Sequence, residues 1–195
     1  MQIVKTKRFF ATIVLSVALA TSASAQTFAV KNNLLYDGAQ TPNLGFELKL
    51  SDHWTTVLSG GYRPWPTDDH KEKKWRHLLV DWEMKRWFCS TFHRDFIGFN
   101  AVYSHYNASK LKFPLGLYPS VKNERRQGDF VAVGAFYGYS WILSPHWSLE
   151  ALAGVDVGYT WYKRFDCVHC GEYFGKDNKP FLMPKLGINI VYNIK

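Results

Sequence analysis

The feature that most constrains this chain is an alternation of apolar and polar residues with a period of two, which runs through most of its 195 residues. Successive side chains of a β-strand point to opposite faces, so this period predicts strands with two different faces. Between Trp147 and Trp161 one face holds only aliphatic and aromatic residues, and the other holds Glu150, Asp156 and mostly small residues. No helical pattern of similar strength competes. Eight such runs can be laid out, at residues 28–37, 42–50, 54–63, 75–88, 96–106, 128–143, 146–163 and 181–194.

The connections between these runs favour a membrane barrel. Short connections at 51–53, 89–95 and 144–146 alternate with connections that are mostly longer. In the sixth and seventh runs Tyr and Trp lie towards the ends of the apolar face, with aliphatic residues between them, as in a lipid-facing band between two aromatic girdles. We therefore expect a single eight-stranded antiparallel outer-membrane β-barrel with short periplasmic turns and longer extracellular loops. A secreted lipocalin-like binding barrel has the same period and stays open as the alternative.

The N-terminal segment has the three parts of a secretory signal. A basic stretch precedes an apolar stretch over residues 9–20, and Ala23 to Ala25 form a small-residue cleavage site. We expect residues 1–25 to be a cleaved signal peptide and residues 26–195 to form the barrel domain, located in the cell outer membrane.

Composition and charge exclude several classes of protein. Aromatic residues make up 17% and hydrophobic residues 47% of the chain, which excludes a disordered segment, a collagen and a coiled coil. The formal net charge is +8, and three of the positive charges lie in the N-terminal segment, so the remainder is too modest to indicate nucleic acid. The expected partners are outer-membrane lipid and lipopolysaccharide, and no cofactor is expected.

Ten charged residues are expected to face the interior. An eight-stranded barrel has an interior just wide enough for side chains. Five acids and five bases could pair across it and close it as a salt-bridged plug, because buried charges are tolerable only when they have partners. The alternation assigns to this lumen network Lys31, Glu47, Lys49, Arg63, Asp81, Glu83, Lys85, Glu150, Asp156 and Lys185.

The sharpest local motif is Cys167-Val-His-Cys170. In an oxidising envelope a disulfide between Cys167 and Cys170 is the simplest interpretation. Zinc binding with His169 stays open, although a second cysteine pair is absent. Cys89 is expected at the opposite end of the barrel from this motif, and it is expected to be a lone thiol.

A basic segment lies between the fifth and sixth runs. Its charges are either solvated or contact lipopolysaccharide phosphates or an acidic surface partner. The surface-loop candidates are Lys110, Lys112, Lys122, Arg125 and Arg126.

Catalysis is not expected. Ser104 and His105 are adjacent on a strand and point to opposite faces, so they cannot form a nucleophile–base pair. An outer-membrane lipid-modifying enzyme, the alternative, needs a serine, a histidine and an acid that converge near one rim.

Several short motifs occur together in one order. They are residues 31–37 (KNNLLYD), 41–45 (TPNLG), 58–62 (LSGGY), 64–65 (PW), 74–77 (KWRH), 86–89 (RWFC), 137–143 (YGYSWIL) and 167–171 with its two cysteines. In this combination the chain resembles a family of small Bacteroidota outer-membrane proteins of unknown function (DUF3575), often encoded near fimbrial assembly genes. The resemblance implies a small outer-membrane barrel and supplies no catalytic residues. The expected function is therefore a non-enzymatic envelope scaffold or surface-loop binding protein, and the family association alone implies a link with fimbrial biogenesis.

Overall fold

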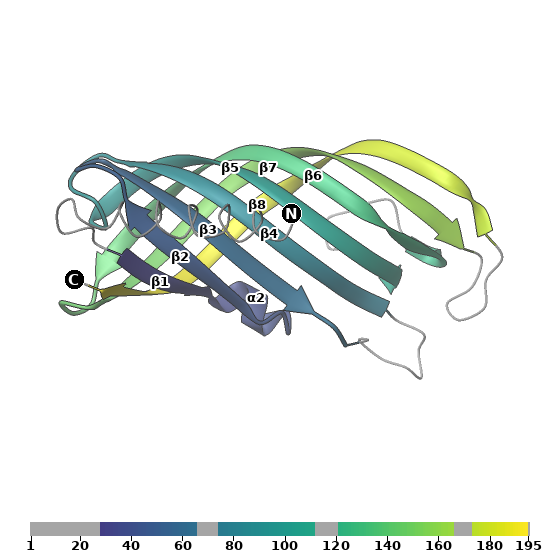
Figure 1. The fold of residues 1–195 in the computed structure, drawn as a ribbon, viewed down its shortest axis with the longest axis horizontal. Coiled ribbons are helices and arrows are strands. Elements are labelled where there is room, and N and C mark those ends of the chain that lie inside the picture. Colours follow the sequence, from purple (N-terminus) through teal and green to yellow (C-terminus); the bar gives the residue numbers. More distant parts are fainter. Residues whose placement is uncertain (1–27, 66–73, 112–120, 166–172, 195) are drawn as a thin grey trace, which may run out of the picture.

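In a computed structural model, eight strands and one short helix make up the described part of the chain, residues 28–65, 74–111, 121–165 and 173–194. Each strand pairs antiparallel with the next, and β1 pairs with β8, which closes the sheet into a barrel (Figure 1). The prediction of eight antiparallel strands is therefore confirmed. In chain order the elements are β1 (Phe28–Asn33), α2 (Leu34–Gly38), β2 (Asn43–Lys49), β3 (Trp54–Arg63), β4 (Lys74–Trp87), β5 (Arg94–Leu111), β6 (Val121–Ile142), β7 (Trp147–Phe165) and β8 (Tyr173–Ile194).

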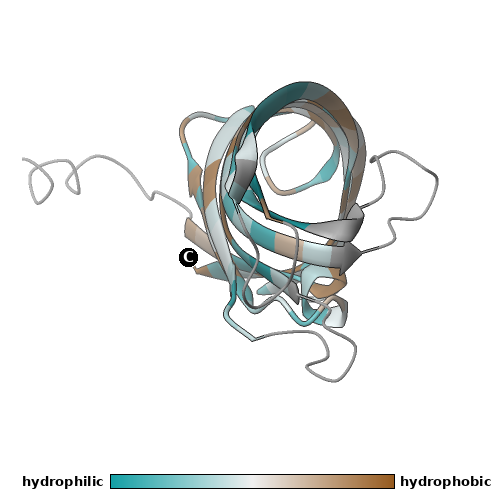
Figure 2. Ribbon diagram, turned by 90° about the vertical axis from the view of Figure 1, so that its right-hand side faces the viewer, coloured by the Kyte–Doolittle hydropathy of each residue, from teal (hydrophilic) through white to brown (hydrophobic). Residues whose placement is uncertain are grey.

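The strands are tilted because the ring closes with a stagger. A row of paired residues that starts at Lys31 in β1 and passes through β2 to β7 reaches Phe181 in β8. On its other side, β1 pairs Lys31 directly with Val191. The stagger of ten residues between these two positions requires strands inclined by roughly 40° to the barrel axis. Figure 2, viewed towards the end with the longer strands, shows the ring that they enclose.

The two faces of the wall have the polarity that the period predicts. Outward side chains such as Val133 and Leu182 are 62% and 55% exposed, whereas the inward side chains of Glu47 and Glu150 are 0% and 1% exposed. The apolar residues lie outside and the charged residues inside, the reverse of the usual arrangement of a water-soluble protein.

The first predicted strand is too long. It was expected over 28–37, but β1 ends at Asn33 and α2 follows. The side chain of Asn33 accepts a hydrogen bond from the backbone N–H of Leu35, which caps the helix at its N-terminus. The consecutive apolar residues Leu34, Leu35 and Tyr36 also end the alternation, because no strand face can hold all three.

Three other predicted strands are too short. Strands expected over 96–106, 128–143 and 181–194 run instead over β5, β6 and β8 as bounded above, so much of the expected loops 109–127 and 166–180 is strand. In these extensions polar residues also occupy outward positions, as where Lys163 pairs with Lys176, so the period of two is lost. The hydrogen-bonded ladder continues because it depends on the backbone and not on side-chain polarity.

Near the short turns the interior is apolar. The indole of Trp87 and the ring of Phe96 lie 4.6 Å apart between centroids, and Phe92, from the turn between β4 and β5, joins them. The buried cluster consists of Ala29, Trp87, Phe92, Phe96, Phe136, Leu152 and Val191. These side chains fill one end of the barrel.

Within the ranges that the structure describes, none of the helices has the length and apolar character needed to cross a membrane.

Candidate functional site: two charged layers in the interior

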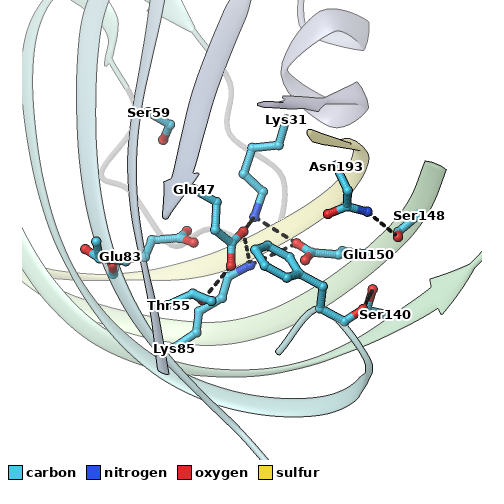
Figure 3. A network of polar contacts seen from close by, with 12 residues as sticks. Lys31, Glu47, Thr55, Ser59, Glu83, Lys85, Ser140, Ser148, Glu150 and Asn193 are labelled. Atoms are coloured by element: carbon cyan, nitrogen blue, oxygen red, sulfur yellow. Dashed lines mark hydrogen bonds and ion pairs between the residues drawn. The ribbon is translucent and has the colours of Figure 1, made fainter. Parts of the chain in front are cut away.

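Next to the buried cluster, on the side away from the short turns, two lysines and two glutamates form a square. It is here called the balanced layer (Lys31, Glu47, Lys85 and Glu150), and the buried cluster beside it is called the aromatic cluster. The ammonium of Lys31 lies 2.9 Å from Glu47 Oε2 and 2.8 Å from Glu150 Oε2. The ammonium of Lys85 lies 3.0 and 2.9 Å from the same two oxygens (Figure 3). Each cation contacts both anions, so the charges cancel within the layer.

Side chains from other strands hold this layer in place. Thr55 donates a 2.6 Å hydrogen bond to Glu47 Oε1, and Trp87 Nε1 donates to the Thr55 hydroxyl at 3.0 Å. The Lys85 ammonium also lies 4.5 Å from the centroid of the Phe96 ring. A Cβ at Gly45 would lie 2.8 Å from Cγ of Lys31, so glycine at this position leaves room for the lysine stem.

Further from the short turns is a second layer, here called the acidic layer (Asp81, Glu83, Asp156 and Lys185). The ammonium of Lys185 contacts Asp81 Oδ2 and lies 2.9 Å from Glu83 Oε1. Asn100 Nδ2 donates to Asp156 Oδ2 at 3.3 Å. The layer thus holds three carboxyl groups and one lysine, and the lysine contacts two of them.

The acidic layer contains acceptors that the rest of the described chain does not satisfy. Asp81 Oδ1, Asp156 Oδ1 and Asn100 Oδ1 are buried and have no hydrogen-bond partner there. Asp81 and Glu83 also line a cavity of about 30 Å³, room for about one water molecule. Its other lining residues include Lys31, Asn33, Tyr36, Asn43, Ser59, Lys185 and Asn189.

The structure places eight of the ten predicted lumen residues in these two layers and two elsewhere. Lys49 is an exception, because it lies at the rim by the short turns and contacts Asp52 at 2.9 Å. The hydrogen bond from Lys49 lowers the pKa of Asp52 below its ordinary value. Including Lys49 among the pairs across the lumen was therefore wrong, since the last inward position of a strand lies at the rim.

Arg63 is the second exception. It donates to the carbonyl oxygen of Ala39 and, at 2.9 Å, to the side chain of Gln40, and its guanidinium lies 4.8 Å from the Trp75 ring. Arg63 thus attaches the two residues that follow α2, Ala39 and Gln40, to strand β3. The alternation predicts that Arg63 points inward, but it does not predict where along the barrel axis Arg63 lies.

The alternation did not identify the neutral residues of the site. Asn100 and Thr55 face inward on their predicted strands and could have been included by the same rule. Tyr36 could not, because it reaches the cavity from α2, and only the Asn33 cap before Leu34 signals that helix.

The basic surface segment is only partly described. Lys112 lies outside the described residues, and for Lys110 and Lys122, on β5 and β6, only the backbone is described. Arg125 and Arg126 belong to β6 and not to a loop: Arg125 Nε donates to Asn107 at 3.0 Å, and the Arg126 guanidinium lies 4.9 Å from the Tyr162 ring. The Cys167–Cys170 motif also lies outside the described residues, and Cys89 is a free thiol.

Ser104 and His105 lie on opposite faces of β5. The Ser104 hydroxyl is buried and donates to the carbonyl oxygen of Leu78 at 2.8 Å, while His105 Nδ1 contacts Asp129 on the outer face at 2.8 Å. Among the residues with described positions, no three His, Cys, Asp or Glu side chains are grouped so as to hold a metal ion.

Comparison with known proteins gives a match to a family model. Neither a curated protein nor a solved structure matches the chain. The model of a family described as "Protein of unknown function (DUF3575)" matches residues 11–194, nearly the whole sequence. The chain therefore belongs to the DUF3575 family.

Proposed function

We propose that this protein is an outer-membrane β-barrel with a closed interior that acts as a non-enzymatic envelope scaffold or surface-loop binding protein. The observation that carries the proposal is the inverted polarity of the wall. Its lumen holds ion pairs, and its outer surface holds large apolar side chains on every strand from β2 to β8.

The exposed apolar surface is too extensive for a protein that lives in water. A soluble monomer rarely exposes a contiguous apolar patch of more than a few hundred Å². Here Leu58, Val133, Val155, Leu182 and Leu186 are each at least 55% exposed, and they belong to four strands, β3, β6, β7 and β8, of which the last three are neighbours in the ring. A lipid bilayer would cover all of these side chains at once.

The positions of the aromatic residues support the same environment. Trp54, Trp147 and Tyr192 lie on the outer face near the short turns, and Tyr159 and Trp161 lie towards the other end. Tyr and Trp prefer the interface between hydrocarbon and water, where an apolar ring and a polar group are both satisfied. The separation of the two groups supports a membrane band between them.

A lipocalin-like barrel in solution is less consistent with the interior. Such a barrel keeps an apolar cavity for a small ligand and a polar exterior. Here the interior holds the balanced and acidic layers, with a cavity of only about 30 Å³. This cavity has no room for a drug-sized ligand.

The balanced layer and the aromatic cluster support a barrel without a pore. Both fill the lumen near the short turns, and a conducting channel needs a wider, water-filled ring. A scaffold role, or binding through the extracellular loops, needs no passage through the wall. Lipopolysaccharide is the proposed lipid partner, and the link with fimbrial assembly rests on the family resemblance alone.

Location is tested by expressing the full chain in a Gram-negative host and separating the envelope fractions. The protein is expected in the outer membrane, resistant to carbonate extraction, with a gel mobility that changes on boiling. Recovery as a soluble periplasmic protein would overturn the proposal and favour the lipocalin-like barrel.

The closed lumen is tested in planar bilayers. Purified wild-type protein and Lys185→Ala are both expected to show no steady single-channel current, because the balanced layer remains intact in both. A steady current from the wild type would make passive transport the leading function. Cross-linking of intact cells followed by purification of the barrel then identifies the partner of its loops.

A further inference from the structure

The barrel wall is much lower at β1 and β2 than elsewhere. β1 has six residues and β2 seven, whereas β6 and β8 have 22 each. Six residues extend about 20 Å along a strand, which a tilt of roughly 40° reduces to about 15 Å of height. The apolar band of an outer-membrane barrel is about 25 Å tall. If the protein spans a membrane as proposed above, β1 and β2 do not reach across it.

The low wall leaves one edge of β8 without a strand partner. β1 pairs with β8 only from Asn189 to Ile194, so within the described chain residues 173–188 have a neighbouring strand, β7, on one side only. In Figure 1, β8 continues well beyond the end of β1. The gap in the wall lies between this edge and the tops of β1 and β2.

Two prolines adapt this edge to an apolar environment. Pro180 and Pro184 pair with Tyr159 and Val155 of β7 and are four residues apart, so both nitrogens lie on the same edge. Proline has no N–H and occurs in sheets where the missing donor faces away from the neighbouring strand. At the open edge the two prolines remove donors that hydrocarbon could not satisfy, and they also weaken the edge as a template for another strand.

The helix α2 lies at this gap, next to β8 (Figure 1). Leu34 and Leu35 are 39% and 41% exposed, while Tyr36 lines the cavity of the acidic layer. Asp37 accepts hydrogen bonds from Asn43 and, more weakly, from Asn32, which attach the helix to β1 and β2. A short helix, and not a hydrogen-bonded wall, thus separates the cavity from the surroundings of the barrel.

The cavity behind α2 suits a cation. Asp81 is 6% exposed, lines the cavity and has an Oδ1 without a partner among the described residues, in a layer that holds three carboxyl groups and one lysine. The described carboxylates are not grouped as metal ligands. A primary ammonium fits better, because it is about as large as a water molecule and donates three hydrogen bonds. Asp81 Oδ1, Glu83 and the Tyr36 hydroxyl supply acceptors.

From these observations we propose that α2 covers a lateral port, through which the primary ammonium head of a membrane amphiphile reaches the cavity at Asp81 while its apolar chain stays in the bilayer. This inference rests on the membrane location proposed above. The apolar chain of the amphiphile contacts the exposed side chains beside the gap, which include Leu34, Leu35, Leu182 and Leu186.

Binding is tested by thermal unfolding of the full barrel in lipid nanodiscs that contain dodecylammonium. A ligand that binds only the folded state raises the melting temperature, and saturation is expected to give about 5 °C. Dodecyltrimethylammonium, which lacks N–H donors and is larger, and uncharged dodecanol are expected to give no shift. Ethylammonium, which has the head without the chain, is expected to bind at least tenfold more weakly. Equal effects of all four probes, or none of dodecylammonium, would overturn the proposal.

Matched variants locate the site. Asp81→Asn is expected to lose the shift, and Asp129→Asn, which changes a carboxylate on the outer face, is expected to keep it. Both variants must first show the gel mobility of a folded barrel, and Asp81→Glu, which keeps the charge, is expected to retain part of the shift. A shift that persists in folded Asp81→Asn contradicts the site.

The position of α2 is tested without any ligand. In a background with all three cysteines replaced by serine, a fluorophore is attached at Leu35→Cys, at Leu182→Cys or at Asp52→Cys, and bilayers carry lipids with a quencher on the acyl chain. Labels at positions 35 and 182 are expected to be quenched, and the label at position 52, on an exposed side chain of a short turn, is expected to be protected. Quenching at 182 but not at 35 removes α2 from the bilayer and overturns the port, while the membrane location stands. A barrel that does not enter membranes at all overturns the proposed function itself.

Discussion

The balanced and acidic layers use the same chemistry in different proportions. In the balanced layer two lysines each contact two glutamates, and Thr55 and Trp87 support Glu47 from below. In the acidic layer a single lysine serves Asp81 and Glu83, and Asp156 has only the amide of Asn100 within hydrogen-bond distance. The first layer sits against packed aromatic rings and the second against a cavity.

The difference shows how burial and charge balance separate stability from binding. A buried charge is tolerated when its partners cancel it, and a surplus calls for a counter-ion or another ligand. The balanced layer therefore has the arrangement of a structural plug, in which Glu150 Oε1 is the carboxylate oxygen without a hydrogen-bond partner among the described residues. In the acidic layer Asp81 Oδ1 and Asp156 Oδ1 both lack such a partner, and Asp81 lines the cavity, which is the arrangement of a binding site.

The largest effect is expected from breaking the balanced layer. Glu150→Gln leaves two lysines to share one glutamate, and removing one member of a buried ion pair costs about 3–5 kcal/mol. The measurement is the free energy of unfolding in urea, followed by tryptophan fluorescence of the barrel in vesicles. The double variant Lys85→Met/Glu150→Gln restores neutrality and is expected to be more stable than Glu150→Gln alone. Equal stability of the single variant and the wild type would show that the layer is hydrated and not a plug.

A smaller loss is expected from removing the support beneath this layer. Trp87→Phe keeps most of the aromatic contact with Phe96 but removes the 3.0 Å hydrogen bond to Thr55, which in turn orients Glu47. A hydrogen bond of this kind contributes about 1 kcal/mol. The same unfolding assay measures the loss, and Trp161→Phe on the outer face serves as the control. If Trp87→Phe matched its control, Thr55 would hold Glu47 without help from the indole.

The acidic layer is expected to respond less to the matching change from carboxylate to amide. Asp81→Asn removes part of a negative surplus and leaves Lys185 paired with Glu83 at 2.9 Å. Its free energy of unfolding is expected to stay within about 1 kcal/mol of the wild type, because the lost ion pair and the reduced repulsion oppose each other. A loss as large as that of Glu150→Gln would show that the two layers do not differ.

The smallest effect is expected at the rim. The hydrogen bond from Lys49 lowers the pKa of Asp52, so its contribution is present above the ordinary pKa of an aspartate and disappears as the pH falls through the lowered value. Asp52 is fully exposed, where such pairs contribute little. Asp52→Asn is therefore expected to change the melting temperature by no more than about 1 °C at pH 7, and the difference from the wild type should vanish in acid. A larger change would assign Lys49 to the lumen network after all.

The strand faces, and hence the residues that enter the lumen, follow from the periodicity of the sequence. The inward direction of Glu47, Asp81 and Lys185 follows from a period of two, because pleating fixes the side of each residue once a strand is recognised. The rule fails where apolar and polar residues do not alternate. It does not predict α2, which Asn33 caps at its N-terminus, nor the polar extensions of β5, β6 and β8.

Which of the inward residues contact one another depends on how the closed barrel aligns distant strands. Lys31 and Glu150 are 119 positions apart and share a hydrogen bond because the ring closes with a stagger of ten residues, which sets the height of every strand relative to the next. That stagger groups four charges into a neutral square, leaves three acids with one lysine, and places Lys49 at the rim. Alternation along a strand carries no information about height, whereas hydrogen bonding between distant strands fixes it. For the same reason, the low wall at β1 and β2 and the position of Tyr36, which reaches the cavity from α2, emerge only when the barrel is closed.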